Sequence, residues 1–168
     1  MSVSFSGELA WELHVPFEGL VEVYKALIAA GKAFGLAHFG LHATESMRIE
    51  KGYRHWKADL ITEFNPVECS LDRFVRMDKQ FVGKPALQAM VKAGPRAVFV
   101  CLELDHDAAP AHPGDSMVVD GRVVGTVTSA AWGHRVQKNL AMGFVDPLYA
   151  HIGCDLQVEV IGEPVAAK

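Results

Sequence analysis

The chain has 168 residues, of which half are hydrophobic and 21% are charged, a balance typical of a globular protein with a hydrophobic core. Its formal net charge of −4 argues against nonspecific nucleic-acid binding, and no apolar stretch approaches the length of a membrane span. Three widely spaced cysteines without a C-x-x-C pair argue against a disulfide scaffold and a structural zinc site. Without the pattern of a signal peptide at its start, the chain is expected to be cytoplasmic and to bind neither nucleic acid nor membrane.

The first part of the chain predicts a strand followed by a helix. From Glu8 to Val15, apolar and polar side chains alternate strictly, which is typical of a half-buried strand. After Pro16, apolar residues recur at helical spacing from Phe17 to Ile28, with charged residues between them. Gly31 is placed where a glycine commonly ends a helix.

A second helix is predicted from Leu41 to Lys51, closed by Gly52. Glu45 and Arg48 lie three residues apart in it, so their side chains are spaced to pair on the helix surface. Three further elements are predicted before the middle of the chain: an extended segment over 53–61, a strand over 71–77 and a short helix over 84–92.

Beyond Gly94-Pro95, the best candidate for a linker, the sequence becomes rich in short β-strands. Asp120-Gly121 stands between two valine-rich runs and predicts a tight hairpin, because this pair adopts the positive φ angles of a type I′ turn. Further strands are predicted over 97–104, 123–129, 139–145 and 156–161. Such a series indicates a small barrel or a curled sheet.

Few residues suggest chemistry by pattern alone. His38 and His42 are four apart, but no third ligand is placed by the sequence, so we expect ordinary histidines and no metal site. Tyr53-Arg54-His55-Trp56 combines aromatic and basic side chains, which suit a flat heterocycle with a carboxylate tail. The simpler interpretation is a strand that packs one aromatic ring inward.

Several blocks, in order, resemble the glycine-cleavage T-protein (aminomethyltransferase) family. Residues 5–16, FSGELAWELHVP, resemble the family signature Y-T-G-E-x-G-x-E-(hydrophobic)-x-V-P. Residues 40–52, GLHATESMRIEKG, resemble its helix G-L-x-A-R-D-S-L-R-L-E-x-G. The form EKGYRHW over 50–56 points to the branch that is fused to dimethylglycine and sarcosine dehydrogenases. The resemblance continues over 124–129 and 138–145, which are similar to the family's C-terminal barrel.

The resemblance implies an α+β fold in two parts. We expect a ferredoxin-like α+β subdomain over residues 1–94, which is part of the aminomethyltransferase folate-binding region, and a small C-terminal β-barrel over residues 95–168. In the family, a further folate-binding subdomain precedes the first block and carries an aspartate near the folate N5. Nothing here matches it, so we expect that the chain alone does not complete the reaction, and no catalytic residue is assigned.

The family binds tetrahydrofolate, and its pterin-recognising glutamate falls on Glu12. A carboxylate offers two acceptors to the adjacent N–H groups of the pterin edge. Tyr53 and Trp56 are further candidate contacts to the folate. The arginine of A-R-D-S-L-R falls on Thr44, which is kept as a candidate contact although it lacks the charge. Arg48 matches the second arginine, and we expect it to have a structural role beside Glu45.

In the dehydrogenase branch, the resemblance implies that a separate flavin domain oxidises an N-methyl amine and that the folate region captures the carbon. We therefore expect tetrahydrofolate as the cofactor, with FAD only in a partner or in a domain outside this sequence. A homodimer or a flavin dehydrogenase chain is the expected partner, because strand and helix residues such as Trp11, Phe17 and Tyr24 would otherwise be exposed. The alternative is a non-catalytic subunit or interaction protein that retains the fold.

Overall fold

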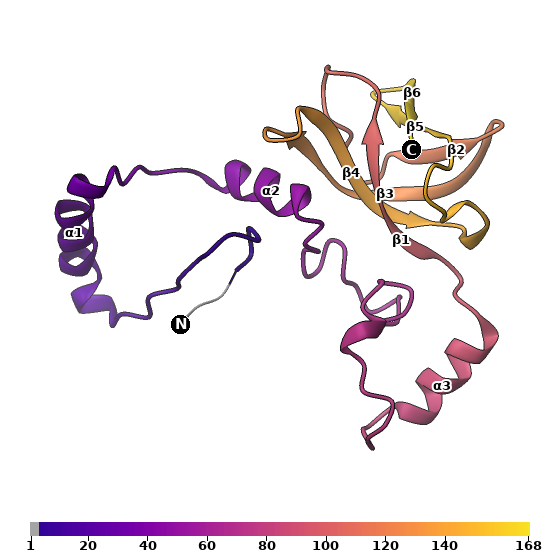
Figure 1. Cartoon of the computed structure of the whole chain (residues 1–168), viewed down its shortest axis with the longest axis horizontal. Helices are drawn as coiled ribbons and strands as arrows, with labels where there is room; N and C mark the ends of the chain where they lie inside the picture. The colour runs from indigo at the N-terminus through magenta and orange to yellow at the C-terminus, as the bar shows by residue number, and fades with distance from the viewer. Residues whose placement is uncertain (1–3) are drawn as a thin grey trace.

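A computed structural model describes residues 4–168 and shows three helices followed by a closed β-barrel (Figure 1). The helices are α1 (Leu20–Gly31), α2 (Leu41–Glu50) and α3 (Lys84–Ala93), with short 3-10 helices at Phe17–Gly19, Lys32–Phe34, Asp72–Phe74 and Pro147–Tyr149. The strands are β1 (Val98–Leu104), β2 (Ser116–Val119), β3 (Arg122–Gly133), β4 (Lys138–Val145), β5 (Leu156–Val160) and β6 (Glu163–Ala167). The predicted α+β class with a C-terminal barrel is confirmed.

The barrel is antiparallel, with the strand order β1-β4-β3-β2-β5-β6. Its β2–β3 hairpin turns at Asp120 and Gly121, whose φ angles of 49° and 74° are those that the sequence predicts. Where β3 pairs with β4, the register shifts between Val127 and Ser129, so that Thr128 forms a bulge. This bulge lies on the side of the barrel that meets the helical part of the chain.

The barrel interior is a single apolar cluster that includes Met117, Val127, Ala141 and Val158. Two glycines permit this packing, because β3 and β4 approach each other too closely for side chains at Gly125 and Gly143. A Cβ at either position would collide with backbone atoms of the opposite strand. These glycines are therefore required by close approach and not by a turn.

The predicted helices are confirmed, but the predicted strands before the barrel are wrong. Within residues 4–97, the structure describes isolated bridges and turns where a ferredoxin-like sheet was expected. Residues 8–15 are irregular, 53–61 form turns around a Trp56–Leu60 bridge, and 71–77 contain a 3-10 helix. The physical reason is that a strand needs a neighbour for its backbone groups, and no described strand lies beside these segments.

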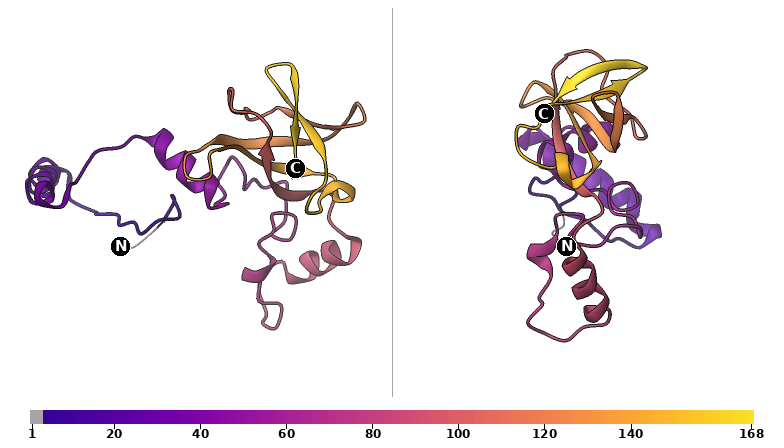
Figure 2. Two further views of the ribbon diagram at one scale, coloured as in Figure 1. Left: turned by 45° about the horizontal axis from the view of Figure 1, so that its top comes forward. Right: turned by 90° about the vertical axis from the view of Figure 1, so that its right-hand side faces the viewer.

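Residues 9–40, which we call the arm, leave the body of the protein and return to it (Figure 1). The start of the arm is held by Glu8, whose Oε1 lies 3.4 Å from Lys51 Nζ and 3.0 Å from Arg135 Nη1. Its end is the beginning of α2, which packs against the barrel. Between these anchors α1 stands apart from the barrel, and Figure 2 shows the same separation from another side.

Glu68 connects the segment 65–68 to β1, the first barrel strand. Its carboxylate is buried and accepts hydrogen bonds from the backbone N–H groups of Asn65 and Arg96, at 2.9 and 3.0 Å, and from the Arg96 guanidinium. Its carbonyl accepts from Phe99 N at 2.8 Å.

Among the described residues no helix is long and apolar enough to cross a membrane.

Glu68 makes folding stability dependent on pH. The Arg96 guanidinium bonded to it, with the two backbone donors, lowers the pKa of Glu68 from 4.5 to about 2 against the opposing effect of burial. Because the folded pKa lies below the unfolded value, this stabilisation is complete above about pH 4.5 and is lost as the pH falls toward 2. Its size is on the order of 2 kcal/mol, since Arg96 is largely exposed and water screens the pair.

The expected result is that Glu68→Gln lowers the free energy of unfolding at pH 7 and flattens its fall between pH 4.5 and pH 2. Urea titrations over this pH range measure it, with Glu159→Gln on the exposed face of β5 as the control. An equally steep pH dependence in Glu68→Gln and the control would contradict this role of Glu68.

Candidate functional site

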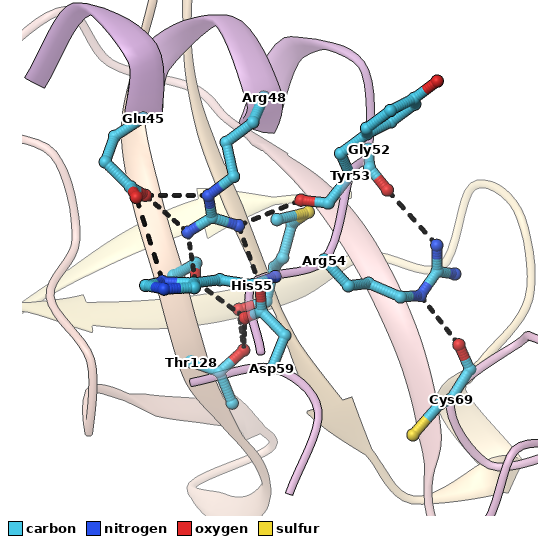
Figure 3. A network of polar contacts seen from close by, with 11 residues as sticks. Glu45, Arg48, Gly52, Tyr53, Arg54, His55, Asp59, Cys69 and Thr128 are labelled. Carbon is cyan, nitrogen blue, oxygen red and sulfur yellow. Dashed lines mark hydrogen bonds and ion pairs between the residues drawn. The ribbon is translucent and has the colours of Figure 1, made fainter. Parts of the chain in front are cut away.

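A buried ion pair joins α2 to the loop that follows it, and Ser129 of β3 connects the pair to the barrel. Arg48 and Asp59 are 2% and 0% exposed, and Arg48 Nη1 donates to Asp59 Oδ2 at 2.8 Å. The same guanidinium donates to Glu45 Oε2, to Ser129 Oγ at 2.8 Å and to the carbonyl of Tyr53 at 3.0 Å. Figure 3 shows Arg48 below α2 and at the centre of these contacts. The expected Glu45–Arg48 pair is present and belongs to this larger network.

The carboxylate of Asp59 is also fully bonded. It accepts from the backbone N–H of His55 and from Ser129 Oγ, both at 2.7 Å, and from the hydroxyl of Thr128 at the β3 bulge. A buried ion pair is stable only when its remaining donors and acceptors are satisfied, because each charge has lost its water. Three segments supply these partners: α2, the loop 52–59 and β3.

The network fixes the loop that contains Tyr53-Arg54-His55-Trp56. Arg48 holds the carbonyl of Tyr53, and Asp59 holds the amide of His55. Arg54 points the opposite way, toward the carbonyls of Cys69 and Gly52, at 2.7 and 3.2 Å. Its guanidinium lies 4.7 Å from the centroid of the Phe99 ring. The loop is therefore anchored on both sides.

Beside this loop lies a hollow of about 510 Å³, which we call the cationic hollow. It is lined by Ser4, Phe5, Lys51, Gly52, Tyr53, Arg54, Leu60, Ser70, Leu71, Arg73 and Phe74. Three of these residues are cationic, three are aromatic and none is acidic. Aromatic faces suit a flat heterocycle, and guanidinium groups suit carboxylates, so the hollow fits an aromatic ligand with an anionic tail.

The structure does not bring the four predicted site residues into one cavity. Tyr53 lines the cationic hollow. Trp56 lines an adjoining hollow of about 550 Å³, which shares Leu60 and Leu71 with the first. Thr44 is half-buried on α2, and its hydroxyl donates to the carbonyl of Gly40 at 3.4 Å.

Glu12 lies on the arm, with its side chain 56% exposed and 3.5 Å from His14 Nε2. It lines neither of these two hollows.

Sequence reasoning missed Phe5, Arg73 and Phe74 as lining residues. Phe5 could have been found, because it stands at the tyrosine of the family signature. Arg73 and Phe74 gave no signal, since they belong to a 3-10 helix that was predicted as a strand. No group of three His, Cys, Asp or Glu side chains in residues 4–168 is arranged to hold a metal ion. His38 instead lies 3.4 Å from the hydroxyl of Tyr24.

Comparisons with known proteins cover nearly the whole chain. Residues 1–79 match the family model described as the GCVT N-terminal domain, and residues 98–168 match the glycine cleavage T-protein C-terminal barrel domain. The chain is 34% identical over 163 residues to mitochondrial dimethylglycine dehydrogenase of Homo sapiens, covering 96% of this chain and 19% of that protein. It is 39% identical over 158 residues to mitochondrial sarcosine dehydrogenase of Homo sapiens, covering 92% and 17%.

The solved structures give the same fold. The crystal structure of glycine cleavage system aminomethyltransferase T from Bartonella henselae superposes with a TM-score of 0.81 at 24% identity. The match covers 91% of this chain and 43% of that chain. The chain therefore spans less than half the length of each of these relatives.

The network predicts that removing the Asp59 charge lowers the free energy of unfolding substantially. Asp59→Asn leaves the buried Arg48 guanidinium without its closest buried counter-charge, so the free energy of unfolding is expected to fall by about 3 kcal/mol. Glu45→Gln is the matched control, because Glu45 is partly exposed and water replaces its contact at a cost of about 1 kcal/mol or less. Urea denaturation at pH 7 measures both, and equal losses in the two variants would contradict the account.

Proposed function

The chain belongs to the glycine cleavage T-protein family, and from this premise we propose that it is the tetrahydrofolate-binding part of a one-carbon transferase. The proposed transferase acts with an N-methyl amine dehydrogenase of the dimethylglycine or sarcosine type. Identities to the human dimethylglycine and sarcosine dehydrogenases support this branch. The flavin of such a dehydrogenase is assigned to a partner or to a domain outside this sequence.

The observation that carries the proposal is the cationic hollow. Tyr53, Phe5 and Phe74 offer aromatic faces on which a reduced pterin can stack. Arg73 and Lys51 supply positive charge for the glutamate carboxylates of folate. The arrangement supports a ligand that is flat at one end and anionic at the other, which describes tetrahydrofolate.

The chain's own residues bind and orient in this proposal, and they carry no bond-breaking step. Tetrahydrofolate, when bound, supplies the N5 nitrogen that accepts the one-carbon unit. Arg48 and Asp59 hold the Tyr53–His55 backbone, so that Tyr53 meets the ligand without further ordering. Trp56 in the adjoining hollow is proposed to extend the stacking surface. Thr44 on α2 is proposed as a peripheral hydrogen-bonding contact.

Glu12 is proposed to recognise the pterin edge from the arm. Its two carboxylate oxygens match a pair of adjacent N–H donors on the pterin. Because its side chain faces solvent here, this contact requires the arm to form one wall of the site. The exposure of Glu12 also favours a second candidate function, that of a non-catalytic subunit which keeps the fold without binding folate.

Titration with folinic acid separates the two candidates. Saturable quenching of tryptophan fluorescence is expected below millimolar ligand, and no binding at millimolar ligand would reject the folate proposal for this chain. Arg73→Ala is expected to raise the dissociation constant about tenfold by removing a carboxylate contact. Arg122→Ala, an exposed arginine of β3, is the control that should leave affinity unchanged.

Glu12→Gln tests the pterin contact. The amide places a donor opposite a pterin donor, so a loss of about 1–3 kcal/mol in folate affinity is expected, or roughly 5-fold to 150-fold in the dissociation constant. Glu18→Gln is the matched control, because Glu18 is another glutamate of the arm. Equal affinities for Glu12→Gln and the control would remove Glu12 from the site.

A further inference from the structure

Arg54 is a half-buried cation within the wall of the cationic hollow, whereas the other two cations of the hollow are exposed. Its Nε donates to the carbonyl of Cys69 at 2.7 Å, and its Nη1 donates to the carbonyl of Gly52 at 3.2 Å (Figure 3). The guanidinium carbon also lies 4.7 Å from the centroid of the Phe99 ring. These three contacts fix the position of the guanidinium and the direction of its remaining N–H groups.

The third guanidinium nitrogen, Nη2, is available to a ligand. It makes no hydrogen bond to any residue within 4–168, the range that the structure describes. A guanidinium binds a carboxylate best through two neighbouring nitrogens. Each such pair contains Nε or Nη1, and in Arg54 both already donate to the wall. Nη2 therefore suits a single acceptor, such as a ring carbonyl oxygen.

The burial of the three cations indicates which part of a ligand each one meets. Lys51 and Arg73 are exposed, so a charged tail that contacts them keeps much of its hydration. Arg54 is less exposed than either and lines the same hollow as the rings of Phe5 and Tyr53. This arrangement favours the flat ring of the ligand, and not its anionic tail, as the partner of Nη2.

We propose that Arg54 is a specificity residue of the hollow, whose Nη2 donates to the carbonyl oxygen at ring position 4 of a pterin. This inference rests on the proposed function, because it assigns one contact within the folate site. In a pterin, that oxygen lies beside the N–H donors for which Glu12 is proposed. A ring with an amino group at position 4 would place a donor against the Arg54 donor, and a site built for a hydrogen bond discriminates strongly against such an analogue.

Folic acid and aminopterin test this contact, because the two molecules differ only in the oxygen or amino group at ring position 4. Equilibrium dialysis of the full 168-residue chain at pH 7 measures both dissociation constants. Folic acid is expected to bind about tenfold more tightly than aminopterin, or better. Arg54→Met keeps a long side chain without a donor and is expected to reduce this preference to about twofold or less.

Arg54→Gln is the second variant. Its amide can donate to the oxygen or accept from the amino group, so the preference is again expected to be lost. Loosening of the wall by either substitution would weaken both ligands alike and leave the ratio of their dissociation constants unchanged. Arg73→Ala is the matched control, because it is expected to weaken both ligands through their shared tail and to keep the preference for folic acid.

Equal affinities of the unmodified chain for the two ligands, or tighter binding of aminopterin, would overturn the inference and leave folate binding in place. A preference for folic acid that both Arg54 variants retain would also overturn it, since a purely structural Arg54 gives that result. Absence of binding of either ligand would reject the proposed function itself, and the inference with it.

Discussion

The ion pair between Arg48 and Asp59 is the constraint on which the rest of the structure depends. Both charges are removed from water, so each must be satisfied by protein groups in fixed positions. Those groups come from α2, from the loop after it and from the Thr128–Ser129 bulge of β3. The pair can therefore form only when α2, the loop after it and the barrel are in one relative arrangement.

The candidate ligand site follows from this constraint. The loop that carries Tyr53 and Arg54 is held to the barrel through Asp59. The segment 70–74, which lines the other side of the hollow, follows Glu68, and Glu68 is bonded to the start of β1. The cationic hollow lies between loop and segment, so its walls rest on a rigid scaffold. The arm is different, because α1 stands apart from the barrel and none of its residues is buried.

Local signals predicted the parts of the fold that local interactions determine. Asp120-Gly121 specified its hairpin, and the apolar spacing of residues 17–28 specified the first helix. The pattern over 8–15 failed because alternation reports a covered face, and the cover is absent from the described chain. Arg48 was assigned a structural role in advance, but its partner Asp59 could not be found, since the two lie 11 positions apart with the end of α2 and an irregular loop between them. Arg73 and Phe74 reach the hollow through tertiary packing alone.

Native-state hydrogen exchange tests the central claim most directly. The amide of His55 donates to the Asp59 carboxylate, and the amide of Tyr53 donates to the carbonyl of Arg48. If the ion pair locks α2 and the loop after it to the barrel, the amides of His55 and Tyr53 exchange only through global unfolding, with the same opening free energy as the amide of Val127 in β3. Exchange of His55 and Tyr53 through a local opening several kcal/mol below that of Val127 would contradict the account.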